Sequence, residues 1–166
     1  MPNVKNFARA LMALHNLDLL KDEACKEPVK LFIRQATESR HWHNTAHYRS
    51  KAAANLINQE SLGTAAAYQR YCRANLRHEH IVPNAVIYKI ILDESDITLD
   101  FLEKTLRRYG LRATITRDED PMLLRDRMPK EFFQEGHALY LNPLARYIAA
   151  GLSDSLERRT TDYWVV

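Results

Sequence analysis

Apolar residues recur every three or four positions along much of this chain, which is the period of a helix that buries one face. Near the N-terminus, Val4, Phe7, Leu11 and Leu14 follow this period. The same pattern, with proline or capping residues at several starts, predicts further helices over residues 28–36, 44–58, 65–72, 84–91, 99–109 and 143–150. Gly110 is expected to end the helix over 99–109 in the left-handed conformation.

Residues 76–83 and 111–116 follow a different pattern, in which apolar and polar side chains alternate. Alternation is typical of a half-buried strand, and residues 161–166 are a third candidate. No Ser/Gly linker, internal repeat or low-complexity run divides the chain. We therefore expect a single α+β domain that is predominantly helical, with a few short strands. Residues 1–75 should form a helical part, and residues 76–166 a mixed part with the candidate site.

The composition excludes several classes of protein. With 46% hydrophobic and 27% charged residues in 166 positions, the chain fits one globular domain. It has only four glycines and no GxSxG, GxxxxGK[ST] or GxGxxG motif, so serine-hydrolase, P-loop and dinucleotide sites are not expected. Two isolated cysteines favour a reducing cytoplasm. No segment approaches the ~20 apolar residues that span a bilayer, so we expect a soluble cytoplasmic protein without a membrane partner.

Basic residues are unevenly distributed along the chain. The formal net charge of +3 does not by itself indicate a nucleic-acid partner. Residues 41–83, however, carry five Lys or Arg against two Asp or Glu, whereas residues 84–166 carry twelve against fourteen. The middle third also holds five of the seven histidines. Chemistry and polyanion binding are therefore expected in this part of the chain.

The first histidine group lies between His41 and Arg49. His43 and His47 share a face if a helix has begun there, and two imidazoles at this spacing could bind zinc if Cys72 or His80 completed the site. The alternatives are a polar surface that contacts phosphates and a solvated helix face without a ligand. The side chains expected to contact nucleic acid here are His47, Arg49 and Lys51.

Three more arginines, Arg70, Arg73 and Arg77, precede the second histidine group. Guanidinium groups hold phosphates through bidentate hydrogen bonds, which position a nucleic acid without reading its sequence. The alternative is that these arginines form ion pairs with the acidic C-terminal half.

The second histidine group reads Arg77-His78-Glu79-His80-Ile81-Val82-Pro83. Its last five residues, from Glu79 to Pro83, resemble the first strand of HNH-type nucleases. The resemblance implies metal-dependent hydrolysis of phosphodiesters, with Glu79 as a ligand of Mg²⁺ or Mn²⁺ and His80 as the general base. The competing interpretation is that these side chains form ordinary hydrogen bonds on a half-buried strand.

An HNH site also has an Asn or His after the first strand. Between Asn84 and His137 the chain contains neither residue type, so His137 and Asn142 are the candidates for further metal ligands. The leading hypothesis is thus an HNH-like nuclease, or a relative with an eroded site, that acts on nucleic acid. The alternative is a non-catalytic binding protein: a regulator, an inhibitor or a nucleic-acid adaptor of a bacterial or phage system, with a possible protein partner.

Overall fold

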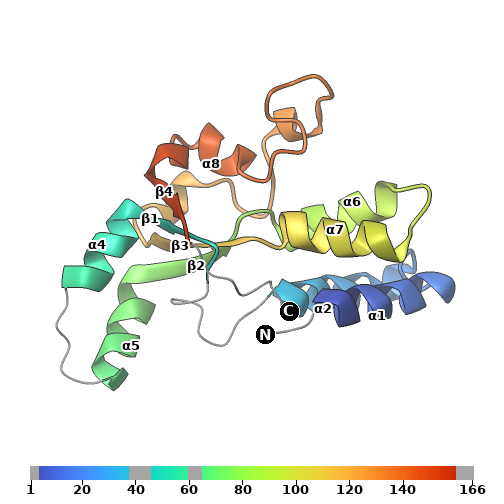
Figure 1. The fold of residues 1–166 in the computed structure, drawn as a ribbon, viewed down its shortest axis with the longest axis horizontal. Coiled ribbons are helices and arrows are strands. Elements are labelled where there is room, and N and C mark those ends of the chain that lie inside the picture. The colour runs from blue at the N-terminus through green and yellow to red at the C-terminus, as the bar shows by residue number, and fades with distance from the viewer. Residues whose placement is uncertain (1–3, 38–45, 60–64, 160–166) are drawn as a thin grey trace.

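The computed structural model describes residues 4–37, 46–59 and 65–159 (Figure 1). Its α-helices are Val4–Asn16 (α1), Lys26–Thr37 (α2), Lys51–Gln59 (α4), Ala65–Asn75 (α5), Asn84–Asp93 (α6), Leu99–Tyr109 (α7) and Ala145–Ala149 (α8). Its strands are Tyr48–Ser50 (β1), Leu76–His80 (β2), Arg112–Thr116 (β3) and Leu156–Arg158 (β4). Single turns of 3-10 helix cover Glu23–Cys25, Asp120–Met122, Lys130–Phe133 and Ser153–Ser155. The predominantly helical α+β class is confirmed.

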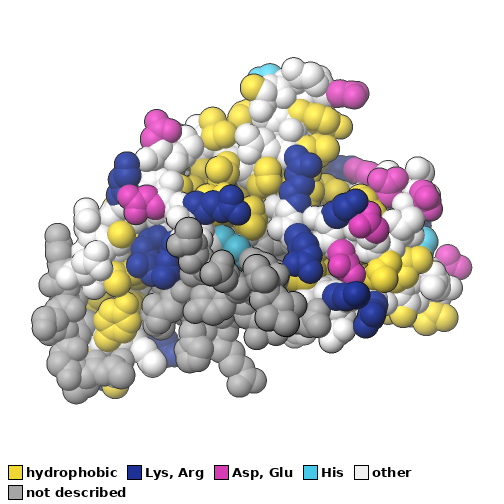
Figure 2. Space-filling view, in the orientation of Figure 1, with side chains coloured by type: hydrophobic (Ala, Val, Ile, Leu, Met, Phe, Trp, Pro, Cys, Tyr) yellow, Lys and Arg dark blue, Asp and Glu magenta, His cyan; other side chains and the backbone are white. Residues whose placement is uncertain are grey.

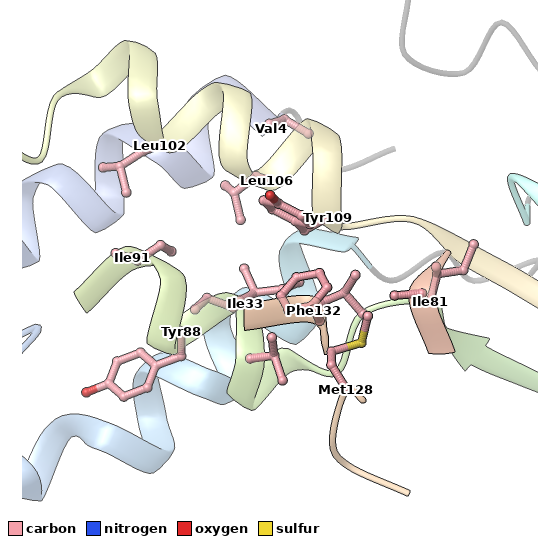
Figure 3. Close-up of a cluster of buried hydrophobic side chains, with 14 of the residues drawn as sticks. Val4, Ile33, Ile81, Tyr88, Ile91, Leu102, Leu106, Tyr109, Met128 and Phe132 are labelled. Carbon is pink, nitrogen blue, oxygen red and sulfur yellow. The ribbon is translucent and has the colours of Figure 1, made fainter. Parts of the chain in front are cut away.

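Four helices form one side of the molecule, where α1 packs on α7 and α2 packs on α6 (Figure 1). Their apolar faces meet in the main core, which Figure 3 shows in part. Leu11 of α1, Ile33 of α2 and Leu102 and Leu106 of α7 are all fully buried. Each such side chain contributes roughly 1.5–3 kcal/mol relative to an exposed one, so this packing holds the helices in place.

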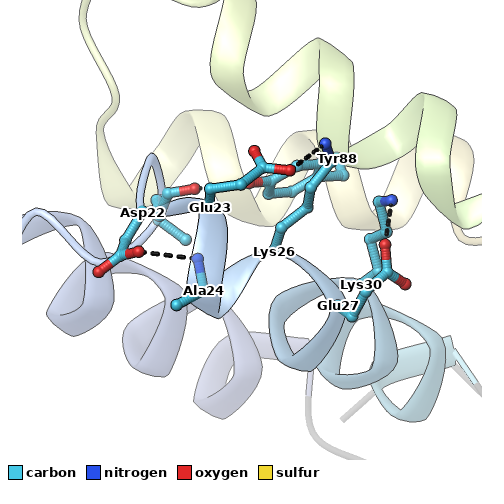
Figure 4. Close-up of polar contacts among 8 residues, drawn as sticks. Asp22, Glu23, Ala24, Lys26, Glu27, Lys30 and Tyr88 are labelled. Carbon is cyan, nitrogen blue, oxygen red and sulfur yellow. Dashed lines mark hydrogen bonds and ion pairs between the residues drawn. The ribbon is translucent and has the colours of Figure 1, made fainter.

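Local polar contacts define the start of α2 (Figure 4). The Asp22 carboxylate accepts a hydrogen bond of 2.8 Å from the Ala24 amide and so begins the 3-10 turn before the helix. On the neighbouring helix α6, the Tyr88 hydroxyl donates to the Leu20 carbonyl at 2.7 Å. The Nζ atom of Lys30 lies 5.9 Å from the centroid of the Tyr88 ring, so α2 and α6 also meet through this aromatic side chain.

The four strands form one sheet in the order β2-β3-β1-β4. Strand β3 is antiparallel to β2 and parallel to β1, and β4 is antiparallel to β1. Ala113 and Ile115 of β3 face the main core, which also contains Tyr147 of α8. The opposite face begins at Leu76, which packs with Ala53 of α4 and Cys72 of α5.

This opposite face becomes polar toward the other end of the strands. The antiparallel register pairs His78 with Thr114 and His80 with Arg112, and directly paired residues share a face of the sheet. The parallel register places Arg49 beside Thr114. The face toward the main core thus carries Ala113 and Ile115 together with Arg77 and Glu79, and the other face is rich in histidine and arginine beyond Leu76.

Most predicted elements are present, with two corrections. The helix predicted over 44–58 is wrong at residues 48–50, which form β1 and bring a strand into the part expected to be helical. Gly110 ends α7 at a φ of −72°, not in the left-handed region, because its amide closes the last turn on the Leu106 carbonyl. The predicted strand over 161–166 lies outside the described residues, and the C-terminal strand that the structure describes is β4. Within the described ranges, no helix is both long enough and apolar enough to cross a membrane.

Candidate functional site

Glu79 and His80 are neighbours at the end of β2, and successive side chains of a strand project to opposite faces. Glu79 pairs with Ala113 in the register, so its side chain lies on the face covered by α8. His80 pairs with Arg112 and lies on the polar face. The predicted metal ligand and the predicted base are thus on different sides of the sheet.

Arg146 of α8 occupies the surroundings of Glu79. Its side chain is only 3% exposed, and its Nη2 atom lies 3.4 Å from Oε2 of Glu79. Its guanidinium also donates to the Leu124 carbonyl at 2.9 Å and to the His80 carbonyl. Arg146 therefore ties the end of β2 to α8 and to the segment that follows β3.

His80 is held in its neutral form. Burial lowers its pKa to about 3, and the positive charges of Arg112, Arg34 and Arg146 lower it further in the same direction. An imidazole with so low a pKa is a weak proton acceptor at neutral pH.

His137 and Asn142, the remaining predicted ligands, lie in the segment before α8. Nδ1 of His137 accepts a hydrogen bond of 3.1 Å from the Leu139 amide, and Oδ1 of Asn142 accepts one of 3.0 Å from the Leu144 amide. Nδ1 of His137 and Oδ1 of Asn142 are thus both hydrogen-bonded to nearby backbone amides. Nowhere among the described residues do three or more His, Cys, Asp or Glu side chains gather as a metal site would require.

His47 has a defined tautomer and a defined place at the start of β1. Its Nδ1 accepts a hydrogen bond of 3.0 Å from the backbone amide of Arg112, so the ring proton must be on Nε2. Burial lowers its pKa to about 4, and the charges of Arg112 and Arg158 add to this shift. His47 is therefore a neutral hydrogen-bond donor.

His47 also lines a cavity of about 340 Å³ that we call the arginine pocket. Its other lining residues are Arg107, Arg108, Arg158, Arg159, Tyr48, Leu111 and Pro143. Four arginines thus line one cavity, and its described lining includes no Asp or Glu. In the view of Figure 2, several Lys and Arg side chains lie across the middle of the molecule, with a histidine among them.

Three segments that are distant in the sequence bring these arginines together. Arg107 and Arg108 occupy the last turn of α7, where positive charge complements the helix dipole. Arg158 pairs with Tyr48 in the antiparallel register, and the Arg159 amide donates to the His47 carbonyl at 2.8 Å. Pairing of β4 with β1 therefore places Arg158 and Arg159 beside Arg107 and Arg108.

The residues predicted to contact nucleic acid do not lie together in the structure. Burial lowers the pKa of Arg49, and the charge of Arg159 contributes, so Arg49 lies near the arginine pocket. Arg77 lies on the opposite face of the sheet, with its Nε 3.7 Å from Oδ2 of Asp120. Lys51 is exposed at the start of α4, and Arg70 and Arg73 are exposed on α5. His43, proposed with His47 as a zinc ligand, lies outside the described residues.

The four pocket arginines escaped the sequence analysis because they lie in the acidic C-terminal half of the chain. Their one sequence signal is the pair of doublets, Arg107-Arg108 and Arg158-Arg159. Comparison with known protein families, with curated proteins and with solved structures finds no match to this chain. The site's own geometry and chemistry must therefore support the assignment of a function.

Proposed function

We propose that this protein is a non-catalytic nucleic-acid-binding protein that holds the phosphate backbone in the arginine pocket. The observation that carries this proposal is the convergence of Arg107, Arg108, Arg158 and Arg159 on one cavity whose described lining has no carboxylate. A guanidinium group matches the oxygens of a phosphate bidentately and keeps its charge at all physiological pH values.

The lowered pKa values around the pocket support the same proposal. Burial is the largest cause of the lowered pKa values of His47 and Arg49, and the charges of Arg112 and Arg158 on His47 and of Arg159 on Arg49 add to it, which is consistent with a positive local potential. Such a potential attracts polyanions and raises their rate of association. Four guanidinium groups exceed what one phosphate needs, so two neighbouring phosphates of a strand suit the pocket better than a single inorganic ion.

The test is fluorescence anisotropy with labelled single-stranded and duplex DNA and RNA over a range of salt concentrations. The variant Arg107→Ala/Arg158→Ala removes one exposed pocket arginine from α7 and one from β4. We expect a loss of affinity of at least about tenfold, because each charged hydrogen bond is worth roughly 1.5–3 kcal/mol. The slope of log K against log salt should become shallower by about 1.5.

The matched control is Arg125→Ala/Arg127→Ala, which removes the same charge from two exposed positions that do not line the pocket. This control should bind almost as the wild type does. Equal losses in the two double variants would show that only net charge matters, and the pocket assignment would be wrong. If the wild type bound none of the nucleic acids, the proposed function itself would be wrong.

Metal-dependent cleavage by Glu79 and His80 stays a prediction from the HNH resemblance. A metal ion at Glu79 would have to compete with Arg146, whose charge lies 3.4 Å from that carboxylate. The check is a calorimetric titration of wild type and Glu79→Ala/His80→Ala with Mn²⁺, followed by incubation with plasmid and single strands. Metal binding and cleavage that both vanish in the double variant would establish a nuclease.

A further inference from the structure

A second and larger cavity, of about 630 Å³, lies between α6, α7 and residues 133–141, and we call it the aromatic cavity. Four aromatic side chains line it: Phe101, Tyr109, Phe133 and Tyr140. Phe133 and Tyr140 remain 44% and 40% exposed, although such rings are ordinarily buried. The size is that of a typical ligand pocket.

Arg108 joins the aromatic cavity to the arginine pocket, because it lines both. Its Nη2 donates to the Leu141 carbonyl at 3.0 Å, and its Cζ lies 5.3 Å from the centroid of the Tyr109 ring. Leu141 has a φ of +47°, which is unusual for a bulky side chain. This backbone conformation accompanies the contact that fixes Arg108 between the two cavities.

The aromatic rings of the cavity pack against other side chains on the side away from the cavity. Phe133 packs edge-on against the buried Phe132 with centroids 5.0 Å apart, and Phe132 in turn contacts Tyr109 at 6.3 Å. The Tyr109 hydroxyl reaches the Leu141 carbonyl at 3.4 Å. Phe133 thus offers its ring from a packed support, which lowers the entropy cost of stacking a ligand on it.

The charges of the aromatic cavity are mixed, unlike those of the arginine pocket. Lys89 pairs with Asp93 at 2.7 Å, and Glu94 accepts from the amides of Ser95 and Asp96. Lys104 is also paired, with Asp100 outside the cavity lining. Arg108 therefore brings positive charge to one end of an otherwise largely neutralised aromatic site.

We propose that the aromatic cavity stacks an unpaired base of the same nucleic acid whose phosphate lies in the arginine pocket. The proposal rests on the function proposed above and makes it specific: the protein binds single strands in preference to duplex. Single-strand binding proteins combine a basic groove with aromatic platforms, because every base has a face that can stack. In a duplex both faces of an internal base are covered, so the aromatic cavity has nothing to stack.

The test measures anisotropy of a labelled single strand and of a duplex hairpin with the variant Phe133→Ala/Tyr140→Ala. Both side chains are partly exposed, so the fold should tolerate the change, and far-UV circular dichroism checks it. We expect single-strand affinity to fall about tenfold while duplex affinity stays the same, since stacking on one ring is worth roughly that factor or more. Phe133→Tyr/Tyr140→Phe should bind as the wild type does.

A strand that carries 2-aminopurine gives a second and direct readout, because the fluorescence of this base falls when it stacks. Wild type should quench it, Phe133→Ala/Tyr140→Ala should not, and the control Leu17→Ala/Ile148→Ala, changed at exposed positions outside the cavity, should quench like wild type. Unchanged single-strand affinity and quenching in the aromatic variant would overturn base stacking and leave the arginine pocket standing. Equal loss of single-strand and duplex binding would also overturn it.

Discussion

Arg146 enters the interior from the short helix α8 and ends among acceptors that belong to other elements. Burying a charged group that is 3% exposed is costly, and the bonds of its Nη1 and Nη2 atoms to Leu124, Glu79 and His80 offset that cost. It is a positioning residue for the end of β2, since it contacts both the side chain of Glu79 and the backbone of His80.

The variant Arg146→Met should therefore lower the free energy of unfolding by about 3 kcal/mol, because buried acceptors are left without donors. Urea unfolding measures this loss. Arg146→Lys should recover less than half of it, since one ammonium group does not reproduce the planar guanidinium fork. The control Arg127→Met changes an exposed arginine and should be almost neutral. Wild-type stability in Arg146→Met would contradict the assigned role.

His47 makes stability depend on pH at the scale of a single residue. Its folded pKa of about 4 lies below the ordinary histidine value of 6.5, so folding favours the neutral ring. The contribution is complete above pH 6.5 and is lost as the pH falls toward 4. The charged groups around the ring are Arg112 of β3, Arg158 of β4, Arg159 directly after β4, and Arg107 and Arg108 of α7.

We expect the wild type to lose up to about 3 kcal/mol of unfolding free energy through His47 between pH 7 and pH 4. His47→Asn keeps an acceptor for the Arg112 amide but does not titrate, so its stability should fall less over the same interval. Urea unfolding at several pH values compares the two proteins. Parallel pH profiles would show that His47 is not the titrating group.

At the scale of elements, Ser50 links the end of β1 to the start of α4. Its Oγ accepts from the Ala53 amide at 3.1 Å, as an N-cap does, and donates to Oε2 of Glu119 at 2.6 Å. The same Glu119 oxygen accepts from the Thr116 amide at 2.8 Å. The Glu119 amide donates back to the Thr116 hydroxyl at 3.2 Å, which completes the reciprocal pair of a capping box.

Ser50→Ala should lower the free energy of unfolding by about 1–2 kcal/mol, because it removes a buried cap and one partner of Glu119. Thermal or urea unfolding detects a change of this size. Ser95→Ala alters an exposed serine and serves as the control. If both variants were equally stable, the Ser50 hydroxyl would contribute nothing to the junction between β1 and α4.

The elements also show where sequence patterns succeed. Alternation predicts β2 and β3, and the amphipathic period predicts α1, α2, α6 and α7. β3 is buried on both faces, but its residues still alternate because one face carries Arg112, Thr114 and Thr116. The sequence pattern places the three residues of β1 in a helix, because Tyr48, Arg49 and Ser50 show too little alternation to indicate a strand. It is a strand because β3 and β4 offer it hydrogen-bonding partners on both sides.

At the scale of the whole molecule, one core runs from Val4 to Leu152 and includes buried residues of both chain halves. The helical part predicted over 1–75 therefore depends on the rest: the faces of Leu11 and Ile33 are covered by α6 and α7. A fragment of residues 1–75 should lack a cooperative urea transition in circular dichroism, whereas the full chain should show one transition in near- and far-UV signals. A cooperative fragment would contradict this dependence.

The sequence alone determined which segments are helices or strands wherever a long periodic face had to be buried, and it identified His47 as a candidate contact. The strand predicted over 76–83 already places the neighbours Glu79 and His80 on opposite faces, whereas the tertiary structure alone decided that Arg107, Arg108, Arg158 and Arg159 share a cavity. The physical reason is the distance along the chain over which the determining contacts act. Periodicity is set by neighbours within one or two turns, whereas an electrostatic site is assembled by strand pairing and helix packing between residues more than a hundred positions apart in the chain.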